Sequence, residues 1–405
     1  MKPIVRARRM KPVHSDIRGP LFVEAMKRQK QGIDILKLNT GNPATFGFGL
    51  PDSIKNALME HMQDGVGYCD FKGMPQARQA ICDYETSKGI KGITPDDVFI
   101  GNGVSEVVSF ALTPLLNDGD EVLVPSPSYS LWGNSVYLED GKPVFYTCDE
   151  QANWYPDIQD IRSKITDKTK AIVIINPNNP TGVLYPKELL LEIIQIARES
   201  GLLIFADEIY DRLVMDGKQH ISLASLTEDV PVITLNGLSK SHCLCGYRCG
   251  WMVISGPREL TEDYRQGIIQ LTSLRLCANT MAQIVIPAAL DDMETPASMV
   301  RPGGRIYEQR EATVRELEKI DGLSFVKNDA AFYVFPKLDV KKFNITNDKQ
   351  FAHDLLDVTN ILLVPGSGFD WKDPDHFRIV MLPQADILSD AIRRMGTFLD
   401  GYKQK

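Results

Sequence analysis

Between about residues 95 and 255, short apolar runs alternate with amphipathic helical patterns, and this alternation constrains the fold more than any other feature. Each run is brief and stops in polar residues, as in DEVLVPSPSY (120–129), KAIVIINPNNP (170–180) and LLIFADEIY (202–210). Between two of them, PKELLLEIIQIARES (186–200) places apolar residues at helical spacing. Strands that alternate with helices form βαβ units. The sequence therefore predicts an α/β fold with a mostly parallel central sheet.

The helix-breaking sequence RPGG at 301–304 marks a boundary in the chain. Strand-like stretches such as AAFYVFPKL (330–338) and HFRIVML (376–382) follow it. A chain of 405 residues is also too long for one ordinary core and suits a large domain with a smaller one. We predict an N-terminal arm and part of a discontinuous small domain in residues 1–50, a large domain in 51–300 and the small C-terminal domain in 301–405.

Charge and cysteine content argue against several classes of protein. The 45 lysines and arginines against 53 acidic residues give a net charge of −8, without an extended basic face for nucleic acid. No run approaches about 18 apolar residues, so we expect no membrane span. The N-terminal MKPIVRARRMKP lacks the apolar core of a secretory signal. Seven irregularly spaced cysteines indicate reduced thiols, and together these features predict a cytoplasmic protein.

Polar residues gather at the carboxyl ends of the predicted strands. In an open parallel sheet, ligands bind beyond these ends, where loops converge and the following helices present their N-termini. We therefore expect one cleft to contain Gly103, Val104, Ser105, Tyr129, Asn176 to Asn179, Asp207, Tyr210, Ser239 and Lys240.

Several of these residues suit a ligand with an anionic tail and a flat aromatic ring. GNGVSE (101–106) opens a helix after a strand, where free backbone N–H groups and the helix dipole bind phosphate. Asp207 can pair with a protonated ring nitrogen, which keeps the ring an electron sink. Tyr129 can lie flat on the ring, while Asn179 and Tyr210 can hydrogen-bond a ring hydroxyl.

Lys240 is the predicted reactive group. It closes the apolar strand in PVITLNGLSK (231–240), and Arg248 follows eight residues later as a phosphate clamp. Burial beside cationic neighbours lowers the pKa of an amine, so we expect a lowered pKa for Lys240. In this order, the residues describe a site for pyridoxal 5′-phosphate with Lys240 as the covalent attachment point.

Each residue also has an ordinary structural interpretation. Ser105 and Asp207 could be helix caps, and Tyr129 could be a packing residue. Asn179 precedes Pro180 and could stand in a turn with a cis peptide bond. A further cluster contains zinc-type ligands but matches no structural zinc spacing, so we expect no metal site. That cluster comprises His242, Cys243, Cys245 and Cys249.

The sequence resembles the class I aminotransferases of fold type I over nearly its whole length. The resemblance lies in LNTGNP (38–43), the GNG turn, NPNNPTG (176–182), ADEIY (206–210), Ser239 and Lys240 with Arg248, and FRIVML (377–382). DIRGP (16–20), GYCD (67–70) and SLRLCAN (273–279) are similar to the alanine aminotransferases, also called glutamate–pyruvate transaminases. The resemblance implies a pyridoxal-phosphate enzyme with a large domain and a smaller, discontinuous one.

The resemblance also implies individual roles. Lys240 would bind the cofactor and carry a proton between it and the substrate α-carbon, while Arg378 would bind the α-carboxylate with Gly41 and Asn179 beside it. Apart from the resemblance, Arg18 and Arg275 are our candidates for binding the distal carboxylate of glutamate, because a charged hydrogen bond would favour glutamate while still admitting alanine. Tyr68 would reach the phosphate of the neighbouring subunit in a homodimer with shared sites. The remaining cofactor contacts would come from Gly103, Val104, Ser105, Tyr129, Asn179, Asp207, Tyr210, Ser239 and Arg248.

The expected reaction moves an amino group between L-alanine and 2-oxoglutarate in two half-reactions. Two departures from the family pattern stand out. Gly237 replaces a serine common three residues before the lysine, and His14 and Ser15 stand where alanine transaminases often carry a tyrosine. Two alternatives remain: an aminotransferase with an aromatic, branched or aspartate donor, and a pyridoxal-phosphate lyase of the same fold.

Overall fold

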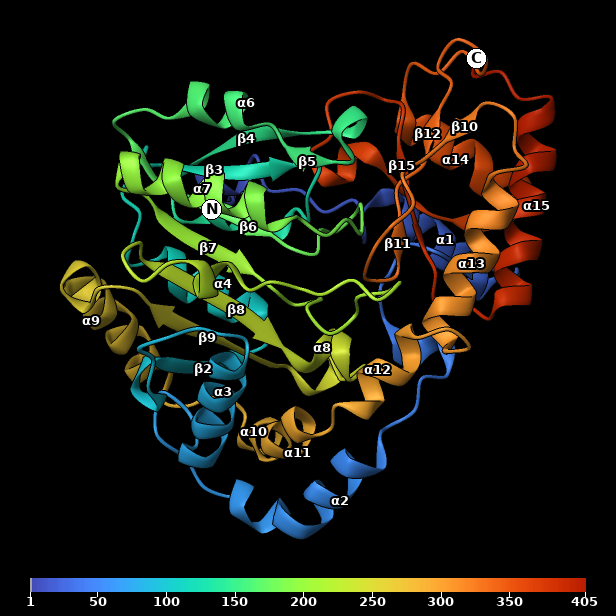
Figure 1. Cartoon of the computed structure of the whole chain (residues 1–405). Coiled ribbons are helices and arrows are strands. Elements are labelled where there is room, and N and C mark those ends of the chain that lie inside the picture. The colour runs from blue at the N-terminus through green and yellow to red at the C-terminus, as the bar shows by residue number, and fades with distance from the viewer. Residues whose placement is uncertain (1) are drawn as a thin grey trace.

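The computed structural model describes residues 2–405, and an eight-stranded sheet lies at its centre (Figure 1). β9 and β5 run antiparallel to their neighbours, whereas the other six strands are parallel to one another. The predicted fold class is therefore confirmed. Across the sheet the strands are β2 (Val98–Asn102), β9 (Cys249–Ser255), β8 (Val232–Gly237), β7 (Leu203–Asp207), β6 (Thr169–Ile175), β3 (Glu121–Ser126), β4 (Lys142–Asp149) and β5 (Tyr155–Pro156).

Helices cover both faces of this sheet, because successive strand residues point to opposite sides. In β7, Ile204 and Ala206 enter one apolar core with α7 and α6, whereas Phe205 enters the other core with α4, α5 and α9. The helices of this part of the chain are α2 (Asp52–His61), α3 (Pro75–Ser87), α4 (Val104–Leu112), α5 (Leu131–Leu138), α6 (Ile158–Lys164), α7 (Lys187–Ser200), α8 (Leu238–Ser241), α9 (Arg258–Arg275), α10 (Thr280–Ile284), α11 (Ile286–Asp291) and α12 (Glu294–Val300).

The crossover helix α7 forms as its sequence pattern predicts. It follows Pro186 and ends at Gly201, whose φ of 65° is the left-handed conformation that glycine adopts readily. Its buried face includes Leu190, Ile193 and Ala197. This face packs in one apolar core with Ile204 and Ala206 of β7, the strand that follows α7 in the chain.

The chain ends combine into a second, smaller α/β unit. β1 (Leu36–Lys37) pairs in parallel with β13 (Ile361–Leu362), and Figure 1 shows the blue α1 among orange and red elements. RPGG separates α12 from the first helix of the C-terminal part. The remaining elements are α1 (Pro20–Lys30), α13 (Arg305–Leu317), β10 (Leu323–Ser324), β11 (Tyr333–Val334), β12 (Lys337–Leu338), α14 (Asp348–Thr359), β14 (Val364–Pro365), β15 (Phe377–Val380) and α15 (Ala385–Asp400).

Short 3-10 helices occur in many of the connections. They are η1 (Arg8–Met10), η2 (Pro43–Phe46), η3 (Met62–Gly65), η4 (Pro95–Asp97), η5 (Glu150–Ala152), η6 (Leu223–Leu226), η7 (Cys245–Tyr247) and η8 (Gly366–Phe369). Within residues 2–405 no single helix is both long and apolar enough to cross a membrane. The helices at residues 258–275 and 280–291 reach the length and apolar content of a membrane span only when taken together, and the chain bends by 120° between them.

An aromatic cluster joins the large sheet to the C-terminal part. The buried Trp154 ring lies 5.6 Å from Phe335, 5.2 Å from Trp371 and 5.1 Å from His376, measured between ring centroids. Glu150, in the same large-domain connection, accepts a hydrogen bond from Lys337 at 2.8 Å. Aromatic packing and this charged contact hold the two parts together beside the strand that carries Arg378.

We expect Trp154→Ala to lower the free energy of unfolding by about 3–5 kcal/mol, because it empties a buried aromatic site. The denaturant midpoint of the purified protein measures this loss. Val358→Ala, at an exposed apolar position on α14, is the control and should stay within about 0.5 kcal/mol of the parent. Equal midpoints for the two variants would contradict a role of Trp154 in joining the two parts.

Candidate active site

The carboxyl ends of the strands and the C-terminal part enclose a cavity of about 880 Å³. Tyr68 does not line it: its side chain is 84% exposed on the surface. Gly103 lies at the edge of the cavity, in contact with Arg248. Asn176, Pro177 and Asn178 do not line it either, since they are buried and Asn176 Oδ1 accepts from the Tyr185 N–H at 2.9 Å. The predicted site residues that do line it are Arg18, Gly41, Val104, Ser105, Tyr129, Asn179, Asp207, Tyr210, Ser239, Lys240, Arg248 and Arg378.

Asp207 ends β7 and is buried at the base of this cavity. Its carboxylate accepts hydrogen bonds from Trp132 Nε1 at 3.0 Å and from the Ile209 N–H at 3.4 Å. Burial raises the pKa of Asp207 to about 6, although both hydrogen bonds and the charge of Lys240 oppose the rise. A carboxylate held by neutral donors alone suits a cationic ligand group such as a protonated ring nitrogen.

Lys240 lies on α8, directly after β8, and its Nζ donates to the Gly41 carbonyl at 3.0 Å. Burial alone favours the neutral amine, but Tyr333, Cys245 and Tyr129 favour the cation and leave the pKa above its ordinary value. The predicted lowering is therefore wrong for the free lysine, because the polar groups of the cavity outweigh desolvation and the opposing Arg378 charge.

The N-terminus of α4 and Arg248 form an anion-binding cup. The N–H groups of Val104 and Ser105 stand in the first turn, where no intrahelical acceptor exists. Gly103, with φ of 83°, lets the guanidinium approach closely, since a Cβ there would fall 2.3 Å from Arg248 Nη2. With the Ser239 hydroxyl on the same cavity wall, these groups fit a phosphate.

Arg378 is a buried guanidinium without a carboxylate partner among the described residues. Its Nη1 donates to Asn179 Oδ1 at 3.0 Å, Nη2 donates to the Asn39 carbonyl, and Nε has no partner in residues 2–405. The rings of Tyr333 and Phe369 lie 4.6 Å from its Cζ. Burial lowers the pKa of Arg378. A positive charge held by neutral groups is suited to receive a substrate carboxylate in two-pronged contact.

Trp132 and Tyr333 are site residues that sequence reasoning missed. Tyr333 Oη lies 2.9 Å from Tyr210 Oη, and its ring stacks on Arg378. Its position depends on the pairing of β11 with β15, which the sequence pattern does not reveal. Trp132 follows Tyr129 by about one helical turn, and this spacing was a signal that could have identified it.

A buried ionic cluster supports the strand ends from behind. Lys88 Nζ lies 2.7 Å from Glu85, 2.7 Å from Glu208 and 3.2 Å from Asp211. Asp211 also accepts from Asn236 Nδ2 at 2.7 Å. Because Glu208 follows Asp207 and Asn236 precedes Lys240 by four positions, the cluster ties the ends of β7 and β8 together.

The same cluster contains a metal-like arrangement. Among residues 2–405, Glu208, Asp211 and His220 are the one group of potential ligands close enough to share an ion. The Lys88 ammonium already contacts both carboxylates and neutralises part of their charge. The cysteine-rich segment near Lys240 does not form such a group in the described chain.

The two candidate arginines for a distal carboxylate occupy different environments. Arg275 Nη1 is paired with Glu106 at 2.6 Å, and its Nη2 donates to the Phe71 and Ile100 carbonyls. Arg18 lines the cavity and has no ion pair in the part of the chain that the structure describes. Of the two candidates, the geometry therefore leaves Arg18 as the one available to a distal carboxylate in this cavity.

The cis peptide bond considered as part of an ordinary turn role for Asn179 is not found there. The cis peptide bonds are Ser126–Pro127 and Asn176–Pro177, not Asn179–Pro180. The turn that carries Asn179 is held by the hydrogen bond from the Gly182 N–H to the Asn178 carbonyl at 2.8 Å. This bond needs no cis geometry at Pro180, and Asn179 still faces Arg378.

A lysine, a buried carboxylate and an anion cup at the carboxyl ends of a mostly parallel sheet fit the chemistry of a pyridoxal-phosphate enzyme of fold type I. The sequence profile described as Aminotransferase class I and II matches residues 33–392. The chain therefore belongs to the class I and II aminotransferases, a family of pyridoxal-phosphate enzymes.

Individual relatives agree with this assignment. The chain is 50% identical over 404 residues to the glutamate-pyruvate aminotransferase AlaA of Haemophilus influenzae, with 100% of both chains covered. It is 45% identical to the alanine aminotransferase of Mycobacterium tuberculosis, covering 100% of this chain and 94% of the relative. The solved alanine aminotransferase from Pyrococcus furiosus has a TM-score of 0.93 and 41% identity, covering 98% of this chain and 100% of the relative.

We expect Asp207→Asn to stabilise the cofactor-free protein at neutral pH while abolishing activity. The folded pKa of about 6 exceeds the unfolded value of about 3.9, so wild-type stability falls as the pH rises between these values. The amide keeps an acceptor for Trp132 and removes the buried charge. Urea unfolding at about pH 7.5 should give a gain on the order of 1–3 kcal/mol.

The exposed Asp373→Asn is the matched control and should leave stability unchanged. Near pH 4, Asp207 is protonated and uncharged in the folded wild type, so the stability advantage of Asp207→Asn should disappear. A variant less stable than wild type at neutral pH would show that the carboxylate charge is not destabilising.

Proposed function

We propose that the protein transfers the amino group of L-alanine to 2-oxoglutarate, giving pyruvate and L-glutamate, with pyridoxal 5′-phosphate as cofactor. The observation that carries the proposal is that Lys240 and the Arg378 guanidinium, which has no carboxylate partner within residues 2–405, line one cavity. The names of full-length relatives that are 45–50% identical support alanine and glutamate as the amino donors.

The cofactor would bind through groups that match its chemistry one by one. The N–H groups of Val104 and Ser105, with Ser239 and Arg248, would hold the phosphate. Asp207 would pair with the ring nitrogen, and Tyr210 and Asn179 would hydrogen-bond the ring oxygen. Tyr129 would stack on the ring. The cofactor supplies an electron sink for the substrate α-carbon and accepts its amino group.

The residues of this chain then position substrate and move protons. Arg378 binds the α-carboxylate, with Asn179 and Gly41 beside it, and so orients the α C–H bond toward Lys240. Lys240 would hold the cofactor through its Nζ, which as a free amine lies 3.0 Å from the Gly41 carbonyl. It then acts as the base that removes the α-proton and as the acid that returns it. Releasing pyruvate and admitting 2-oxoglutarate runs the same steps in reverse.

Arg18 would distinguish the two amino donors. A charged hydrogen bond contributes about 1.5–3 kcal/mol, so a guanidinium near the substrate side chain favours glutamate and 2-oxoglutarate. Alanine lacks the distal carboxylate and binds without this contact. A single cavity can therefore serve both substrates of the reaction.

We further propose that the active form is a homodimer with shared sites. Thr280 Oγ1 donates to the Gly65 carbonyl at 2.6 Å, and Arg275 Nη2 donates to the Phe71 carbonyl at 3.1 Å. These hydrogen bonds hold the segments around residues 65–71 and 275–280 together, and exposed apolar side chains on both segments form a surface that a second copy would cover. Tyr68 would then reach the phosphate of the partner site. The side chains are Met62, Val66, Tyr68, Leu274, Leu276 and Met281.

The first test is an absorption spectrum of the cofactor-loaded protein during substrate addition. L-Alanine should bleach the visible band and release pyruvate, and 2-oxoglutarate should restore the band, because the two half-reactions are separate. Lys240→Ala is the control and should bind cofactor without turnover. If alanine leaves the band intact but an aromatic, branched or aspartate donor bleaches it, that donor is the substrate instead of alanine. Release of ammonia would indicate a lyase.

Substitution of Arg18 tests the specificity assignment. We expect Arg18→Ala to raise the Michaelis constant for L-glutamate by about tenfold, since one charged hydrogen bond is lost. The constant for L-alanine should change by less than about twofold, because alanine makes no such contact. Arg6→Ala, which removes an exposed arm arginine that has no ion pair within residues 2–405, is the matched control. An unchanged constant for glutamate would exclude Arg18 as the clamp.

A further inference from the structure

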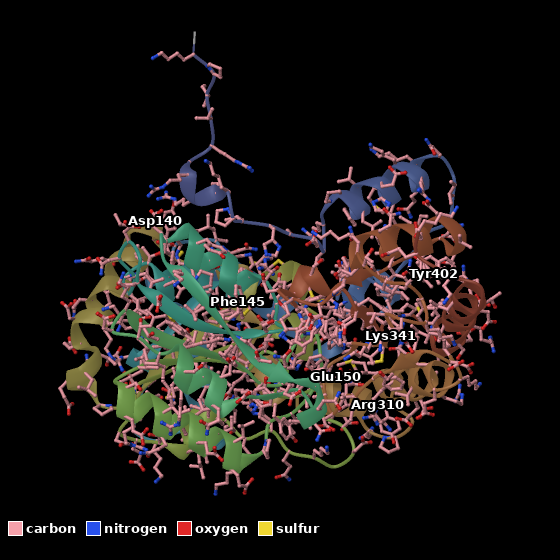
Figure 2. The ribbon with its side chains drawn as sticks, turned by 90° about the horizontal axis from the view of Figure 1, so that it is seen from above. Asp140, Phe145, Glu150, Arg310, Lys341 and Tyr402 are labelled. Atoms are coloured by element: carbon pink, nitrogen blue, oxygen red, sulfur yellow. The ribbon has the colours of Figure 1, made fainter. Side chains whose placement is uncertain are left out.

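The N-terminal arm, residues 2–19, forms part of the wall of the active-site cavity. Ser15, Ile17 and Arg18 line the cavity directly. Figure 2 shows the blue arm passing from the C-terminal part over the molecule toward the region of Asp140, where Arg9 forms an ion pair at 3.2 Å. The position of Arg18 therefore depends on what fastens the arm.

His14 is the residue at which the arm contacts both parts of the molecule. Its backbone N–H donates to Asn134 Oδ1 at 3.1 Å, and its carbonyl accepts from Asn134 Nδ2 at 2.6 Å. Asn134 belongs to α5 of the large domain. On the other side, the His14 ring Nε2 lies 3.0 Å from Asp370 Oδ1, directly after η8 of the C-terminal part.

The ring of His14 stands in an acidic environment. Asp370 faces Nε2, Asp16 lies 3.8 Å from Nδ1, and Lys349 on α14 pairs with Asp16 at 3.2 Å. The Asp370 hydrogen bond and charge raise the pKa of His14, whereas burial and Lys349 oppose the rise. The protonated ring donates to Asp370 and neutralises part of the charge of both carboxylates, whereas the neutral ring can donate through Nε2 but carries no charge to offset theirs.

We propose that His14 is a positioning residue that, when protonated, fastens the arm to both domains and holds Arg18 at the substrate side of the cavity. Loss of the proton weakens the Asp370 contact and lets the arm move away from the cavity. The affinity for dicarboxylic substrates then falls as the pH rises through the titration of His14, while the affinity for alanine does not. The inference rests on the proposed function because Arg18 is the group through which His14 acts.

The sign of the pH dependence follows from linkage. A histidine whose pKa is raised in the fastened state favours that state at low pH, and the advantage is lost as the pH rises through the raised value. Because the ring is partly exposed, water screens the pair and the effect is modest. We expect the Michaelis constant for 2-oxoglutarate, relative to His14→Gln, to rise about twofold to fivefold between roughly pH 6 and pH 8.5.

The experiment compares wild type, His14→Gln and Asp370→Asn holoenzymes across this pH range. Glutamine keeps a hydrogen-bond donor but does not titrate, so the rise of about twofold to fivefold with pH for 2-oxoglutarate should occur in wild type and be absent from His14→Gln. The Michaelis constant for L-alanine should keep the wild-type profile in both variants. His353→Gln, on α14, is the matched control and should behave as wild type for both substrates.

A second measurement follows the arm itself and does not depend on turnover. Hydrogen exchange of peptides from residues 10–19 of the holoenzyme, corrected for the intrinsic pH dependence of exchange, should lose protection with rising pH in wild type but not in His14→Gln. This result would support the fastening role even if the substrate assignment failed. Protection that is independent of pH in wild type, or equal shifts for alanine and 2-oxoglutarate, would overturn the proposal.

Discussion

Burying Asp207 and Arg378 without an ionic partner is the constraint on which the site depends. A charge removed from water costs free energy unless fixed dipoles replace its hydration. Here Trp132 and a backbone N–H serve Asp207, whereas Asn179, the Asn39 carbonyl and two aromatic rings serve Arg378. These neutral contacts leave both charges available to a ligand, so the protein holds in advance the groups that cofactor and substrate complete.

The surrounding fold provides the rigidity that such charges require. Two apolar cores enclose the sheet, and Ile175 and Asp207 at the ends of β6 and β7 lie in register with Leu235 of β8. Behind them, the Lys88 cluster balances three carboxylates with one ammonium group and joins the segments that carry Asp207 and Lys240. Stability and catalysis therefore draw on the same few strand ends, and the charge of Asp207 is a direct conflict between the two.

The sequence predicted the sheet and most of the cavity because both follow from local pattern. Apolar runs that end in polar residues identify parallel strands, and the carboxyl ends of such strands lie at one edge. Contacts between distant segments were not predictable in this way: Tyr333 reaches Tyr210, and His14 reaches Asp370, only after the C-terminal part has packed against the sheet. The pKa of Lys240 was predicted in the wrong direction for the same reason, since Tyr333 belongs to a strand far along the chain.

The pairing of β1 with β13 has a consequence for how the enzyme is made. Leu36 lies opposite Ile361, and the Gly41 carbonyl that receives Lys240 follows that strand by only a few residues. Synthesis runs from the N-terminus, so the N-terminal segment leaves the ribosome long before its partner strand exists, and this contact of large sequence separation forms late. The large sheet can form first, but the catalytic lysine gains its neighbour and its arginine only when the last strands of the chain have emerged.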